Sequence, residues 1–101
     1  MTVKLVVLYT KPDDADAFDK HYLEQHGPLV DALPGLQRWE GATFIAAPDR
    51  GEETYHRMAE LYFADLDALH AALAADAGKA TAADYAQIAP TGSRMFIAAV
   101  D

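Results

Sequence analysis

The sequence predicts an α+β fold in which one four-stranded antiparallel sheet carries helices on one face. Two observations support this class. Apolar residues recur with strand-like spacing in four segments and with helix-like spacing between them, so strands and helices are interleaved. The chain has 101 residues, of which 51% are hydrophobic, and this is enough for one core and a single domain over residues 1–101.

The first expected elements are a strand and a long helix. Residues 3–9 are rich in β-branched and apolar side chains and end before a Lys-Pro-Asp-Asp turn, as a strand does. Asp13 or Asp14 can cap the helix, which a Leu-Pro-Gly sequence stops. A Gly-Pro pair interrupts it, so we expect a kink at residues 26–28. One helix face carries Phe18, Tyr22, Gln25/His26, Leu29 and Leu33.

A hairpin, further helices and a last strand complete the chain. Residues 36–47 and 54–63 read as strands joined by the polar loop 48–53, and residues 94–100 read as the terminal strand. Between them, a helix with a stripe of leucines is expected to begin after Asp65. The stripe consists of Leu66, Leu69 and Leu73.

Gly78 is expected to end or kink that helix, and Thr81 with Asp84 resembles a weak capping pair for a short last helix.

The resulting order, β-α-β-β-α-(α)-β, is the ferredoxin-like split βαβ pattern. Both alternating sets of side chains in the first and last predicted strands are apolar, so the sequence leaves open which sheet face meets the helices. The helices are too few to cover both faces. We therefore expect a homodimer in which a second copy covers the free face.

Charge and cysteine content exclude several classes of function. Eight basic against sixteen acidic residues give a net charge of −8, which disfavours binding to nucleic acid and to anionic membranes. The absence of cysteine excludes disulfides, thiolate nucleophiles and cysteine-ligated metals. The apolar run at the N-terminus is too short to span a bilayer and lacks a signal-peptide pattern, so we expect a cytoplasmic protein.

The strongest local signal for chemistry is the pair Tyr22 and His26. The two residues are four apart, so they share the helix face that points toward the sheet. A histidine and a tyrosine at the mouth of an apolar cleft can transfer a proton to or from a carbonyl compound. The alternative is structural: a buried histidine bonded to backbone, with a tyrosine that only packs. Spacing alone favours the structural alternative.

The chain resembles the EthD family over nearly its whole length. The resemblance rests on a first strand ending in Leu-Tyr, then Phe-x-x-x-Tyr-x-x-x-His-x-Pro-Leu, then Leu-Pro-Gly-Leu and an Ala-Gly … Ala-Asp tail before the closing strand. The motif residues are Leu8, Tyr9, Phe18, Tyr22, His26, Pro28, Leu29, the segment 33–36, and Ala77, Gly78, Ala83 and Asp84. Gly27 and Tyr85 depart from the pattern.

The resemblance implies a dimeric α+β barrel that handles a small aromatic, polyketide-like or lactone-like compound in a degradative or biosynthetic pathway. It implies proton transfer or cofactor-independent oxidation, with no cofactor. In an enzyme of this kind, His26 would act as general acid/base and Tyr22 would orient it or the substrate oxygen. Tyr9, Phe18 and Trp39 would line the apolar pocket. Two alternatives stay open: a non-catalytic ligand-binding or accessory homodimer, and haem or metal binding through a helix histidine.

The other histidines predict no metal site. On an α-helix, His21 and His26 point about 140° apart and cannot chelate one ion. His56 and Glu60 share a strand face, which is more typical of a solvated or interfacial face than of a metal pair. We expect His70 at the boundary of its helix.

Overall fold

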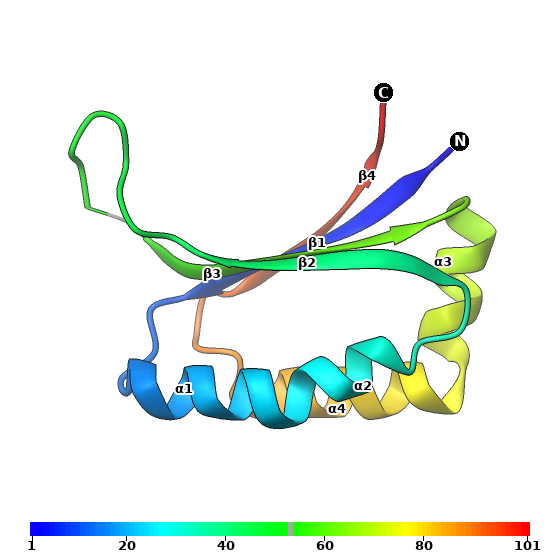
Figure 1. Cartoon of the computed structure of the whole chain (residues 1–101), viewed down its shortest axis with the longest axis horizontal. Coiled ribbons are helices and arrows are strands. Elements are labelled where there is room, and N and C mark those ends of the chain that lie inside the picture. The colour runs from blue at the N-terminus through cyan, green and yellow to red at the C-terminus, as the bar shows by residue number, and fades with distance from the viewer. Residues whose placement is uncertain (53) are drawn as a thin grey trace.

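The computed structural model describes residues 1–52 and 54–101 and confirms the predicted α+β class, with Glu53 of the predicted loop outside the described residues. Four antiparallel strands form one sheet in the order β2-β3-β1-β4, and the helices cover one face of it (Figure 1). The elements are β1 (Val3–Thr10), α1 (Ala15–His21), the π-helical turn η1 (Tyr22–His26), α2 (Gly27–Asp31), β2 (Leu36–Thr43), β3 (Tyr55–Phe63), α3 (Leu66–Ala74), α4 (Asp76–Ile88) and β4 (Arg94–Ala99). Within the described part of the chain, no helix has the length and apolar character needed to cross a bilayer.

The burial pattern of strand β1 shows which sheet face meets the helices. Its side chains alternate strictly between buried and half-buried, and Leu5, Val7 and Tyr9 belong to the buried set. The register places Ala59 and Leu61 of β3 on the same face, where they join the core under the helices. The sequence could not make this choice because both sets of residues are apolar.

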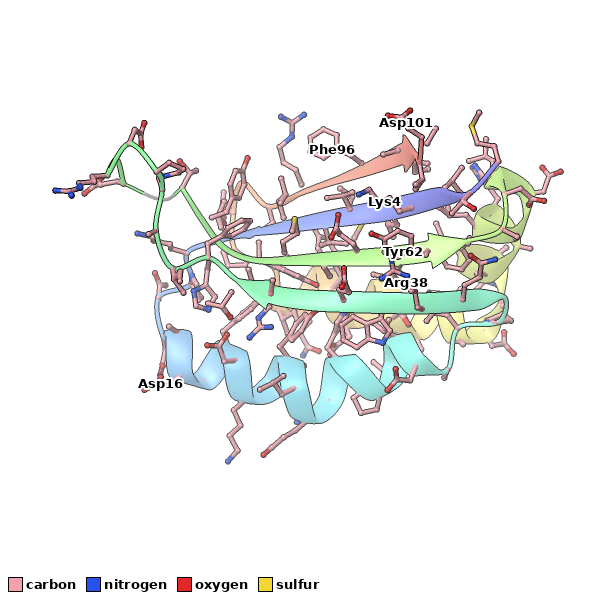
Figure 2. The ribbon with its side chains drawn as sticks, turned by 45° about the horizontal axis from the view of Figure 1, so that its top comes forward. Lys4, Asp16, Arg38, Tyr62, Phe96 and Asp101 are labelled. Carbon is pink, nitrogen blue, oxygen red and sulfur yellow. The ribbon has the colours of Figure 1, made fainter. Side chains whose placement is uncertain are left out.

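The opposite face of the sheet, called here the open face, is a mixture of apolar and charged side chains (Figure 2). Lys4 donates a hydrogen bond of 2.8 Å to Glu60, and the Arg38 guanidinium lies 3.9 Å from the centre of the Tyr62 ring. Phe96 of β4 is 43% exposed on this face. The open face is therefore more polar than the predicted apolar surface.

A π-helical turn interrupts the first helix, whereas the sequence predicted a proline kink. Gly27 donates its backbone N–H to the carbonyl of Tyr22, the i→i+5 bond of a π-helix. Pro28 lies in the first turn of α2, where a missing N–H is tolerated. The helix therefore continues past the Gly-Pro pair through a wider turn, which changes the residues that share a helix face. Such π-helical turns are frequent at functional sites.

Two predictions for the last helices are wrong. Gly78 neither ends nor kinks a helix, because α3 ends before it and α4 runs unbroken through it. Thr81 and Asp84 lie inside α4 and cap nothing; the Thr81 hydroxyl donates instead to the carbonyl of Ala77. The predicted cap at the start of α3 is correct, since an Asp65 carboxylate oxygen accepts the N–H three residues on, at 2.8 Å.

The predicted leucine stripe of α3 is only partly buried. Leu69 is fully buried, whereas Leu66 and Leu73 are 46% and 37% exposed. The strand after the first helix is also shorter than predicted, ending at Thr43 rather than residue 47.

Candidate active site

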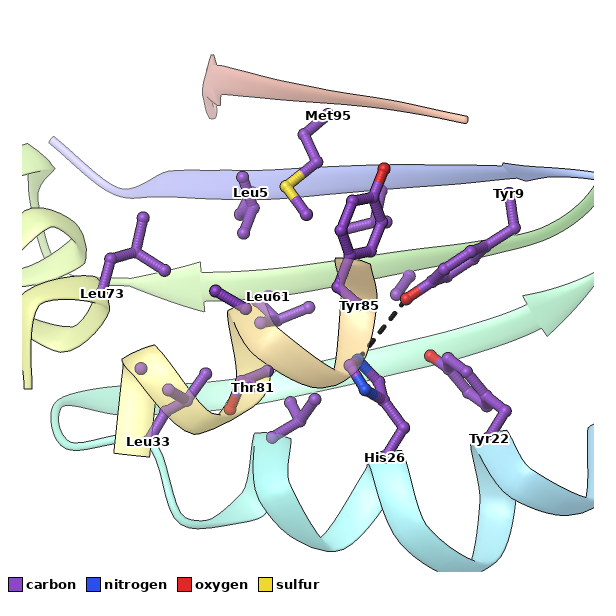
Figure 3. Close-up of a pocket in the computed structure, with 15 residues that line it drawn as sticks. Leu5, Tyr9, Tyr22, His26, Leu33, Leu61, Leu73, Thr81, Tyr85 and Met95 are labelled. Carbon is purple, nitrogen blue, oxygen red and sulfur yellow. Dashed lines mark hydrogen bonds between the residues drawn. The ribbon is translucent and has the colours of Figure 1, made fainter. Parts of the chain in front are cut away.

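A cavity of about 180 Å³ lies between the helix-covered face of the sheet and the helices (Figure 3). Most of its wall is apolar. Polar side chains lie together at one end, where Tyr9, Tyr22 and His26 turn toward one another. A largely apolar cavity with a few convergent polar groups is typical of small-molecule sites. The apolar lining consists of Leu5, Val7, Val30, Leu33, Ala59, Leu61, Leu73, Ala82 and Met95.

His26 is buried at the polar end and has a partner at each ring nitrogen. Nδ1 lies 2.7 Å from Oδ2 of Asp84, and Nε2 lies 3.4 Å from the hydroxyl of Tyr9. The contact with the Asp84 carboxylate requires a proton on Nδ1, because the carboxylate can only accept. In the neutral ring the lone pair is therefore on Nε2, the nitrogen beside the Tyr9 hydroxyl at the polar end of the cavity. This is the arrangement of a general base held by a carboxylate.

Asp84, which the sequence predicted only as part of a helix cap, belongs to the candidate site. Its two oxygens bind two histidines, Oδ1 at 2.8 Å from His21 Nε2 and Oδ2 at 2.7 Å from His26 Nδ1. Burial alone would raise the pKa of Asp84, but the hydrogen bonds from both histidines outweigh it and hold that pKa below its usual value. Asp84 therefore stays ionised beside His26.

The π-helical turn explains why two histidines five apart in the sequence reach one carboxylate. The prediction that they point about 140° apart assumed an α-helix throughout. His21 immediately precedes η1 and His26 is its last residue, so the wide turn lies between them and brings both onto the side of α4. No three His, Cys, Asp or Glu side chains among residues 1–52 and 54–101 form a group suited to a metal ion.

The two tyrosines of the polar end are buried hydrogen-bond donors. Tyr9 and Tyr22 are each 1% exposed, and their rings pack edge to face at 5.6 Å. Burial raises the pKa of Tyr22 to about 12 and raises the pKa of Tyr9 further. Both hydroxyls therefore keep their protons at neutral pH. The ring of Tyr22 also stacks on His26, with centroids 5.4 Å apart.

The structure brings three of the five predicted site residues to the cavity. Tyr9, Tyr22 and His26 line it, whereas Phe18 and Trp39 lie behind the tyrosines. Phe18 packs 5.3 Å from the Tyr9 ring, and Trp39 packs 6.3 Å from the Tyr22 ring. Trp39 also donates its indole N–H to Asp31 at 2.7 Å. A ligand-binding role for Phe18 and Trp39 stays a prediction.

Tyr85 was noted in the sequence only as a departure from the family pattern, yet it lines the cavity. Its ring lies 5.6 Å from that of Tyr9, and burial raises its pKa. The Ala-Asp tail of the family motif is the one sequence signal that includes Asp84, whereas the spacing of Thr81 and Asp84 predicted only a helix cap.

The remaining histidines are engaged elsewhere or exposed. His56 bonds Asp19 at 2.8 Å, and Glu60, its proposed metal partner, bonds Lys4 instead. The register shift between β1 and β3 beside His56 changes the direction of side chains there, which strict alternation could not predict. His70 is exposed on α3.

Two bacterial proteins resemble this chain over most of their length. An uncharacterised 11.0 kDa protein of Rhodococcus erythropolis, from the thcB-thcC intergenic region, is 33% identical over 92% of this chain and 89% of its own length. The crystal structure of an EthD family protein of Bacillus halodurans is 35% identical, covers both chains fully and superposes with a TM-score of 0.94.

Two further solved structures are similar in fold alone. SnoaB of Streptomyces nogalater, a cofactor-independent oxygenase, has 17% identity and a TM-score of 0.69 over 98% of this chain and 92% of its own. A ferredoxin-like protein of Thermobifida fusca, described as dimeric, has 14% identity and a TM-score of 0.74 over 99% and 92%. The EthD domain itself matches residues 11–91, and the chain therefore belongs to the EthD family.

Proposed function

We propose that this EthD-family protein catalyses proton transfer on a small aromatic, polyketide-like or lactone-like compound, without a cofactor and with His26 as general acid/base. The single observation that supports this most is the His26 imidazole. It is 4% exposed, is held through Nδ1 by an ionised Asp84 and presents Nε2 to the apolar cavity. SnoaB, a cofactor-independent oxygenase of the same fold, supports chemistry without a cofactor by analogy.

One ring nitrogen of His26, Nε2, carries the proton in both steps, while Nδ1 stays bonded to Asp84. Nε2 takes a proton from a carbon next to a carbonyl group, and the electron pair of that C–H bond becomes the enolate. Asp84 stabilises the imidazolium formed, and Nε2 then returns the proton to carbon or oxygen. A positioned base of this kind contributes about 10²–10⁴-fold to the rate.

Acetophenone tests this proposal because it is an apolar aromatic ketone with exchangeable protons beside its carbonyl. In D₂O, ¹H NMR follows the loss of its methyl signal. His26→Gln keeps similar volume and hydrogen bonding but cannot take up a proton, so we expect it to reduce the protein-dependent exchange rate by about 10²–10⁴-fold. We expect its melting temperature to stay close to that of the wild type.

His70→Gln is the matched control, because it makes the same change at an exposed position on α3. Equal exchange by the wild type and His26→Gln would contradict the general-base role. Saturable binding of acetophenone without any acceleration of exchange would favour the non-catalytic ligand-binding alternative.

We also propose that two copies associate through the open face of the sheet. Apolar side chains there, including Val6, Leu8 and Phe96, leave surface that a second sheet can cover. The dimeric description of the Thermobifida fusca protein supports this arrangement.

Light scattering coupled to size exclusion checks the dimer. We expect the wild type to elute with twice the chain mass and Phe96→Glu to elute as a monomer, because burying an unpaired carboxylate in the interface is costly. Leu23→Glu makes the same kind of change at a residue that is 64% exposed on the helical side, and it should leave the dimer intact. A dimeric Phe96→Glu would place the interface elsewhere.

A further inference from the structure

Two buried donors beside the candidate active site have no acceptor within the described part of the chain. They are the hydroxyl of Tyr22 and Nε of Arg57, and their residues are 1% and 7% exposed. Buried polar groups are nearly always paired in folded proteins, so each exception needs a reason. A ligand that supplies an acceptor is one such reason.

The two side chains converge at Gly41 on β2. A Cβ at Gly41 would lie 3.3 Å from the Trp39 ring, 3.5 Å from the Tyr22 hydroxyl oxygen and 3.6 Å from Nη1 of Arg57. Gly41 is not one of the glycines with a positive φ, so its missing side chain matters here rather than its backbone freedom. Its strand partner is Ala59, which lines the cavity. Gly41 and Arg57 are not among the residues that line the cavity, but Tyr22 is, so the space lies beside the cavity wall at Tyr22.

Arg57 is positively charged, and the carboxylate of Asp19 balances this charge only in part. Its Nη2 lies 3.3 Å from Oδ1 of Asp19, a long contact, and the same oxygen binds His56 at 2.8 Å. The guanidinium carbon lies 4.4 Å from the centre of the Tyr22 ring. Negative charge on an oxygen bound to Tyr22 would be stabilised by this neighbour, because a buried charge is weakly screened.

We propose that Tyr22, Arg57 and Gly41 form an oxygen cradle that binds the ligand oxygen on which negative charge develops. The ligand class is then a carbonyl compound that forms an enolate, or a phenol that ionises, with its apolar part in the cavity. This inference rests on the proposed function. His26 removes the proton, and the cradle holds the oxygen that receives the charge, as an oxyanion site does.

The ionisation of bound 4-nitrophenol tests the cradle without reference to turnover, because the phenol and phenolate forms absorb at different wavelengths. At saturating protein we expect the wild type to bind the phenolate preferentially. Tyr22→Phe, which removes the donor, should lower the bound phenolate-to-phenol ratio about tenfold, the value of one charge-assisted hydrogen bond. Gly41→Ala, which fills the cradle, should lower it similarly. Tyr62→Phe deletes a hydroxyl on the open face and should change nothing.

The outcomes separate the cradle from the general base. A phenolate ratio that is unchanged in both Tyr22→Phe and Gly41→Ala overturns the cradle, as does failure of the wild type to bind the probe. His26→Gln should lose acetophenone exchange yet keep its preference for phenolate. Loss of that preference in His26→Gln, with none in Tyr22→Phe, would overturn the cradle and leave the general base standing. Phenolate binding without exchange in the wild type would support the cradle and contradict the proposed reaction.

Discussion

Replacing Asp84 by asparagine is expected to lower the acetophenone exchange rate by about 10²–10⁴-fold. The carboxylate accepts the proton of His26 Nδ1 at 2.7 Å and leaves the lone pair on Nε2. An asparagine amide can donate to Nδ1 instead, which moves the ring proton to Nε2 and removes the base from the cavity. The same substitution in a Ser-His-Asp triad lowers the rate by about 10⁴-fold for this reason.

The pH–rate profile in D₂O is the measurement for Asp84→Asn. Asp67→Asn, at an acidic residue in the first turn of α3, is the matched control and should behave as the wild type. A wild-type rate in Asp84→Asn would show that Asp84 does not orient the imidazole.

Asp84 also predicts the pH dependence of stability. Because its pKa is lower in the folded protein than in the unfolded chain, its ionised form stabilises the fold above the unfolded-state pKa of about 3.9. That contribution is lost as the pH falls through the lower folded-state value. Urea unfolding of Asp84→Asn should therefore show a weaker loss of stability below about pH 4 than unfolding of the wild type.

Replacing Gly78 by alanine is expected to destabilise the protein by about 3 kcal/mol or more, since overpacking against backbone leaves little room for relaxation. A Cβ at this position would lie 2.1 Å from the carbonyl oxygen of Ala72 and 2.5 Å from that of Leu73. Both atoms are backbone of α3, so the two helices would have to separate. Denaturant unfolding measures the change in the free energy of unfolding.

Gly27→Ala is the matched control for that substitution. Gly27 has a helical φ of −53°, and a Cβ there would meet only ordinary contacts of 3.5 Å and more. We expect this variant to be neutral or to gain about 0.4–1 kcal/mol. A Gly78→Ala protein as stable as Gly27→Ala would show that the junction of α3 and α4 opens at little cost.

Local patterns were sufficient for much of the fold. The order of strands and helices, the carboxylate cap of Asp65 and the shared face of Tyr22 and His26 all follow from spacing over a few residues, and the structure confirms them. The family motif can also be recognised from the sequence alone, because it consists of particular residues in a fixed order along the chain. Phe18 and Trp39 show the limit of such reasoning, since adjacency to a site residue does not place a side chain at the cavity wall.

The sequence by itself determined an α+β fold of the EthD family and gave His26 as the candidate base. Only the tertiary structure decided which sheet face is buried, that a π-helical turn directs His21 and His26 to Asp84, and that Tyr22 and Arg57 meet at Gly41. The physical reason is the separation along the sequence of the residues that meet. Periodicity reports neighbours three or four residues apart, whereas His26 and Asp84 are separated by 58 residues and meet only when α4 packs beside η1.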